Sequence, residues 1–127
     1  MEFYLERTAH TPLIKFDKGK LLIAGRSIPE DITETYDPLF EAVANYAKHP
    51  EKHTEVSIML DYSNSSTNRV LMSLFDYLNM YLFQNNLSVT VNWYYIKDDK
   101  EMLDLGTDFK EIVKIPFALI EVDDFPE

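Results

Sequence analysis

The sequence predicts a single α/β domain, residues 1–127, with a mixed sheet of four to five strands and about three helices in the order ββαβαβαβ. Two short apolar runs flank a glycine-containing turn near the start, which indicates an antiparallel hairpin. Further along, short apolar runs alternate with longer segments of helical periodicity. Because this alternation needs crossover connections, we expect the last three strands to be parallel.

The hairpin is expected from residues 11–16 (TPLIKF) and residues 21–24 (LLIA), which are joined by the turn at residues 17–20. A small apolar patch at residues 3–5 precedes it and is expected to pair or pack at an edge. The first half of the sheet is therefore predicted from local turn chemistry and β-forming residues.

The first helix is expected to follow Asp31, whose carboxylate is a good N-cap, with Glu34 three residues later as in a capping box. Pro38 interrupts the backbone hydrogen bonds, but the apolar periodicity continues across it, so we predict one kinked helix that ends at residues 49–50. The alternative is a later start, with Asp37 as the N-cap and Pro38 in the first helical position.

The centre of the chain is predicted to be a buried strand, a polar hinge and a long amphipathic helix. Val56, Ile58, Met59 and Leu60 form an apolar, partly β-branched run. Residues 61–68 contain no aliphatic side chain, and helical spacing of apolar residues returns from Val70. This helix is expected to run from about residue 66 to residue 84.

The last third is predicted to be a strand at residues 88–96, a helix from residue 98 to about residue 113 and a strand at residues 115–122. Gly106 lowers the helix propensity of the middle segment. Pro116 near the start of the last strand favours an edge position, because proline donates no ladder hydrogen bond.

The hinge is the segment of the chain whose residues point most clearly to a function. It contains more N-capping residues than one helix needs, and the helix start carries Arg69 where an acidic residue would complement the dipole. Free N–H groups, hydroxyls and a guanidinium together favour an added anion. Two interpretations stay open on the residues alone: an ordinary polar strand-to-helix turn, or a phosphorylated hydroxyl that changes the surface and leaves the fold unchanged.

Composition excludes several classes of function. The net charge is −10, from 12 Lys and Arg against 22 Asp and Glu, which disfavours nucleic-acid binding and an anionic membrane surface. The chain has no cysteine, so disulfides and thiol chemistry are excluded. No signal peptide and no stretch of about 18 apolar residues is recognisable, so a cytoplasmic protein is expected.

No catalytic, metal-binding or cofactor-binding motif is recognisable. The histidines at 10, 49 and 53 lack metal-ligand spacing, and the sequence has neither a glycine-rich phosphate loop nor a nucleophile elbow. The aromatic run at residues 93–95 is expected to bury Trp93 and Tyr95 and to expose Tyr94. Two interpretations of Met72 and Met80 stay open: adaptable contact surface for a partner, or packing beside the buried side of the helix, which is the simpler one.

Several short motifs, in order along nearly the whole chain, resemble one family. They are Thr11-Pro12-x-Ile14, the run 25–30 (GRSIPE), Leu60-x-Tyr62-x-Asn64-Ser65-Ser66, the run 93–95 (WYY) and Pro116-Phe117. Together they are similar to the SiaC family of regulatory phosphoproteins, which have STAS-like domains. The broader STAS resemblance also leaves an anti-sigma-factor antagonist as an alternative function, and a small-molecule-binding protein as a second alternative.

The resemblance implies a switch protein without catalytic activity. In the family, a dedicated Ser/Thr kinase phosphorylates the hinge, a PP2C-type phosphatase reverses this, and the unmodified form binds and activates a diguanylate cyclase, which raises cyclic di-GMP and favours biofilm formation. The modified hydroxyl follows the asparagine of the motif, which is Ser65 here, with Ser66 and Thr67 left open because the family has threonine at this position. Asn64, Ser66 and Arg69 are then expected to contact the phosphate or the partner.

Overall fold

A computed structural model, which describes residues 2–126, has a six-stranded mixed sheet and three α-helices. The strands are β1 Phe3–Leu5, β2 Leu13–Asp17, β3 Lys20–Ser27, β4 His53–Ser63, β5 Ser88–Ile96 and β6 Phe117–Val122. The helices are α1 Ile32–Tyr46, α2 Ser65–Tyr81, the 3₁₀ helix η1 Phe83–Asn85 and α3 Lys100–Ile112. The α/β class and the ββαβαβαβ order predicted from the sequence are confirmed.

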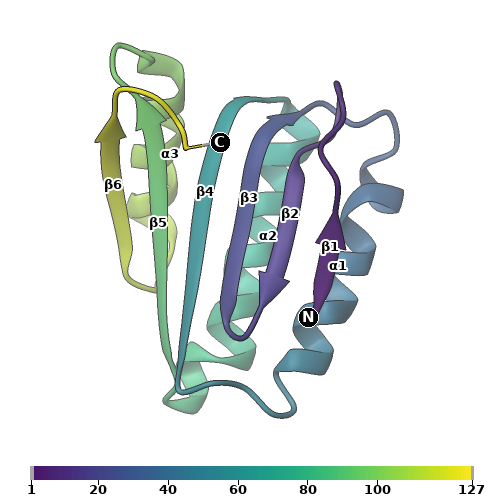
Figure 1. Ribbon diagram of the computed structural model, residues 1–127. Coiled ribbons are helices and arrows are strands. Elements are labelled where there is room, and N and C mark those ends of the chain that lie inside the picture. Colours follow the sequence, from purple (N-terminus) through teal and green to yellow (C-terminus); the bar gives the residue numbers. More distant parts are fainter. Residues whose placement is uncertain (1, 127) are drawn as a thin grey trace.

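The strands lie side by side in the order in which they occur in the chain, from β1 to β6 (Figure 1). β1, β2 and β3 pair antiparallel, and β3, β4, β5 and β6 pair parallel. The sheet has six strands, against four to five predicted, because residues 3–5 pair with β2 as an edge strand. Pro116 precedes β6, which is the other edge, as its missing N–H requires.

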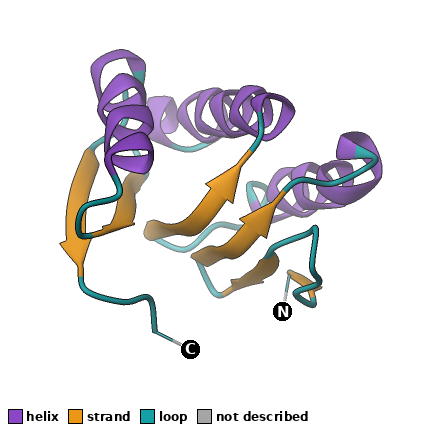
Figure 2. Cartoon of the chain, turned by 90° about the horizontal axis from the view of Figure 1, so that it is seen from above, coloured by secondary structure: helices purple, strands orange, loops and turns teal. Residues whose placement is uncertain are grey.

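All three helices cover the same face of the sheet (Figure 2). The core between the two layers is mainly aliphatic and aromatic, with Trp93, Tyr36, Phe16 and Phe75 as its largest fully buried side chains. Each parallel strand of this sheet is followed by a loop at the same edge, so the start of each helix lies at the carboxyl end of a strand. The hinge between β4 and α2 is therefore at the middle of that edge (Figure 1).

The first helix is continuous across Pro38, as predicted. Asp31 is its N-cap and accepts a hydrogen bond from the backbone N–H of Glu34 at 3.1 Å. Pro38 is exposed, so the carbonyl that loses its backbone partner lies on the side of the helix that water reaches. The alternative start at Asp37 is wrong, because the apolar face of the helix already begins with Ile32 and the buried Tyr36.

Several predicted boundaries differ from the structure. α1 ends at Tyr46 and not at residues 49–50, and β4 runs from His53 to Ser63, beyond the predicted residues 56–60. α2 begins at Ser65 and ends at Tyr81, because the last turn of the predicted helix is the separate 3₁₀ helix Phe83–Asn85. α3 begins at Lys100 because Asp98 has a positive φ of 71° and Asp99 is the N-cap. β6 begins at Phe117, after Pro116, which cannot donate to a ladder.

Candidate functional site

The polar hinge predicted at residues 61–68 spans the end of β4 and the start of α2. A single asparagine organises it. Asn64 is the N-cap of α2 with an extended backbone, and its side chain accepts a hydrogen bond from the N–H of Thr67 at 2.9 Å. Its own N–H donates to the carbonyl of Ser27 at 3.2 Å. Ser65 is consequently the first residue inside the helix and is not its cap.

The four hydroxyl groups of the hinge have different surroundings. Ser63 Oγ donates to Asn68 Oδ1 at 2.6 Å, and Ser66 Oγ donates to Asn64 Oδ1 at 3.1 Å. Thr67 is completely buried, whereas Ser65 is exposed. Among residues 2–126, the hydroxyl of Ser65 makes no side-chain hydrogen bond. Of the predicted acceptors, Ser65 is therefore the most accessible and Thr67 the least.

Thr67 belongs to a buried hydroxyl chain that connects β3, α1 and α2. Thr67 Oγ1 donates to the Ser27 carbonyl at 3.1 Å. Since a hydroxyl has one proton, Thr67 must accept from Ser27 Oγ at 2.8 Å, and Ser27 Oγ must accept from the Tyr36 phenol at 2.7 Å. Burial raises the pKa of Tyr36 to about 12, although the bonds to Ser27 and Thr67 oppose this shift. The chain holds the start of α2 against the sheet.

A β-bulge positions Ser27 for this role. The register between β3 and β4 shifts between Gly25 and Arg26, after which Ser27 pairs with Ser63 at the start of the hinge. Gly25 has a φ of 110°, and a side chain there would meet the Arg7 guanidinium, with Nε at 2.9 Å. The Gly-Arg-Ser sequence therefore provides the backbone geometry that the hinge needs.

The start of α2 has no acidic residue in its first turn, in contrast to α1, which has Glu34, and α3, which has Glu101. Arg69 lies four residues after Ser65, one turn further along the same side of the helix, and is exposed. The structure shows no ion pair of Arg69 among residues 2–126. The first turn of this helix therefore carries no carboxylate to complement its positive end.

A model of the SiaC family, described as regulatory phosphoproteins, matches residues 5–122. The chain belongs to the SiaC family. A relative, an uncharacterized protein of Pseudomonas aeruginosa strain UCBPP-PA14, is 26% identical over 120 residues, which are 93% of this chain and 94% of the relative. The family resemblance found in the sequence is therefore confirmed across nearly the whole chain.

Solved SiaC structures have the same fold. One of them is the crystal structure of the diguanylate cyclase SiaD in complex with its activator SiaC from P. aeruginosa. It contains a chain that is 25% identical to this one, with a TM-score of 0.88. The match covers 94% of this chain and 99% of that chain. Apo-SiaC from P. aeruginosa is 27% identical, with a TM-score of 0.84 and coverage of 93% and 97%. A protein similar to this chain therefore activates a diguanylate cyclase.

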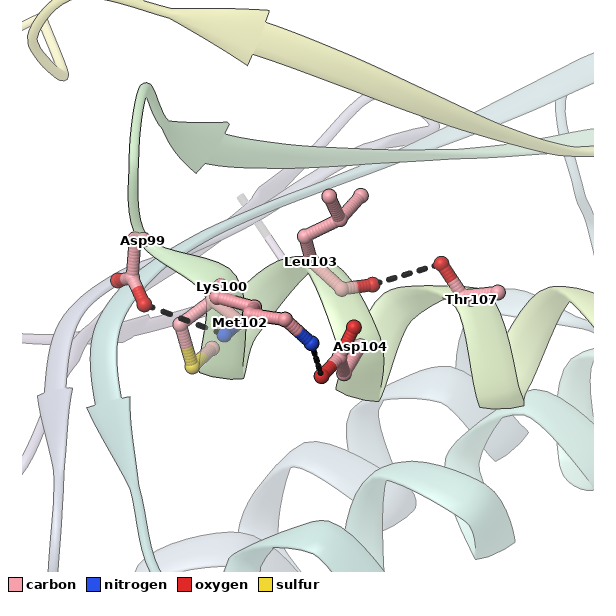
Figure 3. Close-up of polar contacts among 6 residues, drawn as sticks. All are labelled: Asp99, Lys100, Met102, Leu103, Asp104 and Thr107. Carbon is pink, nitrogen blue, oxygen red and sulfur yellow. Dashed lines mark hydrogen bonds and ion pairs between the residues drawn. The ribbon is translucent and has the colours of Figure 1, made fainter.

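A second polar region lies at the start of α3, beside a surface depression of about 350 Å³. The Asp99 side chain caps the helix by accepting from Met102 N at 3.2 Å, and Lys100 pairs with Asp104 at 3.1 Å (Figure 3). Tyr95 and Glu121 also line the depression. The third contact drawn in Figure 3 is a hydrogen bond within the helix, from Thr107 Oγ1 to the Leu103 carbonyl at 2.8 Å. Helix capping, a surface ion pair and this bond account for the contacts drawn, so this region is a structural helix start.

Trp93 does not line that depression, because it is fully buried. Its Nε1 donates to the Met102 carbonyl at 2.9 Å, and its ring packs against Phe109 and Phe117. The prediction that Trp93 is a core residue is confirmed. The prediction that Tyr95 is buried and Tyr94 is exposed is wrong, because both side chains are half-buried near the end of β5. Within residues 2–126 no cluster of three or more His, Asp or Glu is arranged to hold a metal ion, and no helix is long and apolar enough to cross a bilayer.

Sequence reasoning missed Ser27 and Tyr36, which support the hinge from β3 and α1. Part of the signal is in the sequence, because Ser27 ends a mainly buried strand and follows Gly25 and Arg26. Its partner Thr67 is forty residues away in the sequence, so only the parallel pairing of β3 and β4 brings them together.

Proposed function

We propose that this chain is a phosphorylation switch whose unmodified form binds and activates a diguanylate cyclase, with Ser65 as the residue that carries the phosphoryl group. A Ser/Thr kinase adds the group, and a PP2C-type phosphatase removes it. The proposed switch operates in the cytoplasm. The signal it controls is cyclic di-GMP and, through it, biofilm formation.

The observation that carries this proposal is the surroundings of Ser65. Its hydroxyl is exposed and unbonded among residues 2–126, at the first position of a 17-residue helix. A phosphate there would meet free first-turn N–H groups and the positive end of the helix dipole. Arg69, four residues later, would supply a guanidinium for a charge-assisted contact. A phosphoryl group there would add about two negative charges at an exposed position of the helix.

The other hinge hydroxyls are poorer acceptors for chemical reasons. Modification of Thr67 would require the buried chain from Tyr36 through Ser27 to open. Modification of Ser66 would remove its hydrogen bond to the cap residue Asn64 and act on a half-buried hydroxyl. Ser65 therefore remains the proposed acceptor, with Ser66 as the second choice.

The complex of SiaD with SiaC supports a cyclase as the partner in preference to an anti-sigma kinase, because that cyclase is bound by a protein of this family and fold. A small-molecule function would need an enclosed pocket that includes Trp93, and Trp93 is instead a core residue. The two alternative functions therefore have less support than the cyclase switch.

The first test is intact-mass and phosphopeptide analysis of the protein from its native cells. A single phosphoryl group on the peptide that contains Ser65 is expected. Ser65→Ala should abolish it, and the matched control Ser73→Ala, at an exposed serine of the same helix, should retain it. Phosphate retained in Ser65→Ala would contradict the assignment of the residue.

The second test compares cyclase activation by wild type, Ser65→Ala and Ser65→Asp. Ser65→Ala should activate as the unmodified protein does, and Ser65→Asp should bind more weakly because it adds a charge at the contact surface. Ser73→Asp is the matched control for an added carboxylate on α2. Equal activation by Ser65→Asp and wild type, with an intact fold, would count against the switch.

A further inference from the structure

One side of the sheet carries no helix. All three helices pack on the other side (Figure 2), so within residues 2–126 no second layer covers this side, which we call the open face. Strands β3 to β6 pair parallel. Parallel strands are normally covered on both sides by other elements of the protein. The open face is therefore the surface of this fold that most clearly lacks a covering layer.

An apolar row crosses the middle of the open face. It runs through five neighbouring strands as Leu13, Ala24, Met59, Tyr94 and Ile120. Among the described residues, the core beneath the helices contains none of these side chains, and all except Ala24 are half-buried and still reach solvent. An apolar centre surrounded by polar side chains is the usual composition of a protein–protein contact.

The charges of the open face are divided between its two halves. The half formed by β2 and β3 carries Lys15, Lys20 and Arg26 against one carboxylate, Asp17. The half formed by β4, β5 and β6 carries Glu55, and these three strands contain no Lys or Arg. The face therefore has a basic half and an acidic half, which are complementary to each other.

The chain after β6 adds negative charge to the acidic half. Residues 123–126 extend from the end of β6 over the open face (Figures 1 and 2). Asp123 and Asp124 are exposed there. They follow Val122 at the carboxyl end of the parallel strands, which is also the end at which Arg26 lies on β3.

A depression of about 240 Å³ lies in the basic half. Lys15, Asp17, Lys20 and Leu22 of the β2–β3 hairpin line it. Two ammonium groups and one carboxylate give it a net positive charge, so it is suited to a carboxylate from another molecule. Glu55 is such a group on the acidic half of the same face, at the level of Lys20.

A twofold axis between β3 and β4, parallel to both strands, would bring the basic half of one copy over the acidic half of another. Because β3 and β4 are in register, this axis places each residue of β3 opposite its own register partner on β4 of the second copy. Each resulting pair is opposite in charge, large against small, or a cation against an aromatic ring. The pairs are Lys20 with Glu55, Leu22 with Ser57, Ala24 with Met59, and Arg26 with Tyr62.

The other twofold arrangement is unfavourable. An axis across the strands would place β2 and β3 of one copy over β2 and β3 of the other, so that basic half meets basic half. Packing with parallel strands avoids this repulsion, and two sheets that pack face to face commonly keep their strands within about 30° of each other.

The size of the open face limits the strength of such a contact. Six strands make it about 25 Å wide, and the rows from Lys20 to Arg26 make it about 20 Å long. Two copies would bury about 1,000 Å² in total, which is the lower limit for specific interfaces. The association is therefore expected to be reversible and to depend on concentration.

We infer that the open face is the docking surface for a second copy of this chain, in a twofold dimer in which Lys20 of each copy contacts Glu55 of the other. The two helical layers then form the outer surfaces of the dimer, and both hinges lie at the same end of it. Ser65 stays exposed in this arrangement, so the inference goes beyond the proposed function and does not depend on it.

The first test is sedimentation equilibrium of the purified full chain at concentrations up to about 1 mM. The wild type should change reversibly from monomer to dimer as the concentration rises. Met59→Glu should remain a monomer, because it places a carboxylate in the apolar centre of the contact. The matched control is Met80→Glu, at an exposed methionine of α2 in the helical layer, and it should dimerise as the wild type does.

The second test uses charge variants, first separately and then mixed. Lys20→Glu and Glu55→Lys should each weaken the dimer about tenfold, because the twofold axis makes each substitution place like charges together twice. An equimolar mixture of the two variants should associate within about threefold of the wild type, because both contacts of the mixed dimer again have opposite charges. Circular dichroism of each variant verifies its fold.

The mixture separates contacts between copies from contacts within one chain, where Lys20 and Glu55 are also neighbours. A wild type that stays monomeric up to about 1 mM would overturn the inference. A dimer that Met80→Glu disrupts and Met59→Glu leaves intact would place the contact on the helical layer and overturn it as well. A mixture that associates no better than either charge variant alone would overturn the arrangement around β3 and β4. None of these results bears on phosphorylation of Ser65, which has its own tests.

Discussion

Gly106 of α3 lies directly against the indole ring of Trp93 in β5. A methyl group at Gly106 would be 2.5 Å from Trp93 Nε1 and 2.9 Å from Leu119 Cδ2. The same indole donates to the Met102 carbonyl, one turn earlier in the helix. The glycine that lowers helix propensity is therefore the residue that lets α3 approach the sheet.

Gly106→Ala should destabilise the protein by about 1–3 kcal/mol, because the added methyl group overpacks a site with no room. In an open helix the same change would stabilise by about 1 kcal/mol, so the sign of the effect is diagnostic. Urea unfolding followed by Trp93 fluorescence measures it. Asp108→Ala, two residues later and exposed, is the control and should change stability by less than about 0.5 kcal/mol. A stabilised Gly106→Ala variant would contradict the close approach.

Much of the fold could be predicted because its signals are local. Apolar periodicity identified all three helices, and turn residues identified the hairpin. The parallel pairing followed from the alternation of strands and helices. The boundaries were less accurate where backbone geometry decided them, as at Asp98, whose positive φ ends β5 and delays α3. Such a conformation depends on the loop and has no periodic signal in the sequence.

The hinge could be located from the sequence, but its internal contacts could not. Several residues there are equally good caps by type, and only the three-dimensional geometry shows that Asn64 caps the helix and that Ser65 stands free. The burial of Thr67 depends on Ser27 and Tyr36, which belong to other elements. The hydroxyl side chains of the hinge therefore differ in burial because of contacts with residues that are distant in the sequence.

The assignment of the cap gives a stability prediction. Asn64→Ala should cost about 1 kcal/mol, because it removes the acceptor for the Thr67 N–H. Ser65→Ala should cost less than about 0.5 kcal/mol, since an exposed residue at the first helical position loses no hydrogen bond. Chemical denaturation of both variants measures the difference. A larger cost for Ser65→Ala than for Asn64→Ala would show that the cap lies at Ser65.

The buried phenol of Tyr36 makes stability depend on alkaline pH. Its pKa is raised from 10.0 to about 12 in the folded protein. The unfolded chain therefore releases the proton first as the pH rises, and folding stability falls between pH 10 and about pH 12. The total loss from this one group is about 2–3 kcal/mol.

Tyr36→Phe isolates this contribution from the other titrating groups. At neutral pH the variant should be about 1 kcal/mol less stable, because the hydrogen bond to Ser27 is lost. Above pH 10 the difference should shrink and then change sign near pH 12, since the wild type loses about 2–3 kcal/mol and the phenylalanine has no proton to lose. Thermal unfolding of both proteins across this pH range measures the difference, with Tyr62→Phe, at an exposed tyrosine, as the control. A difference that stays constant with pH would contradict the raised pKa of Tyr36.

Phosphate at Ser65 should have a lowered second pKa, because the helix start and Arg69 both favour the dianion. Phosphoserine placed at position 65 can be titrated by ³¹P NMR and compared with phosphoserine at position 73, an exposed site two turns along the same helix. The pKa at position 65 should lie below the usual value of about 6 and below the pKa at position 73, because position 73 is also four residues from Arg69 but has no helix start beside it. Arg69→Ala should raise the pKa at position 65 part of the way back, with the remaining shift due to the helix start. Identical titrations at the two positions would show that the start of α2 does not stabilise the phosphate dianion. The effect of phosphorylation on the partner would then need another explanation.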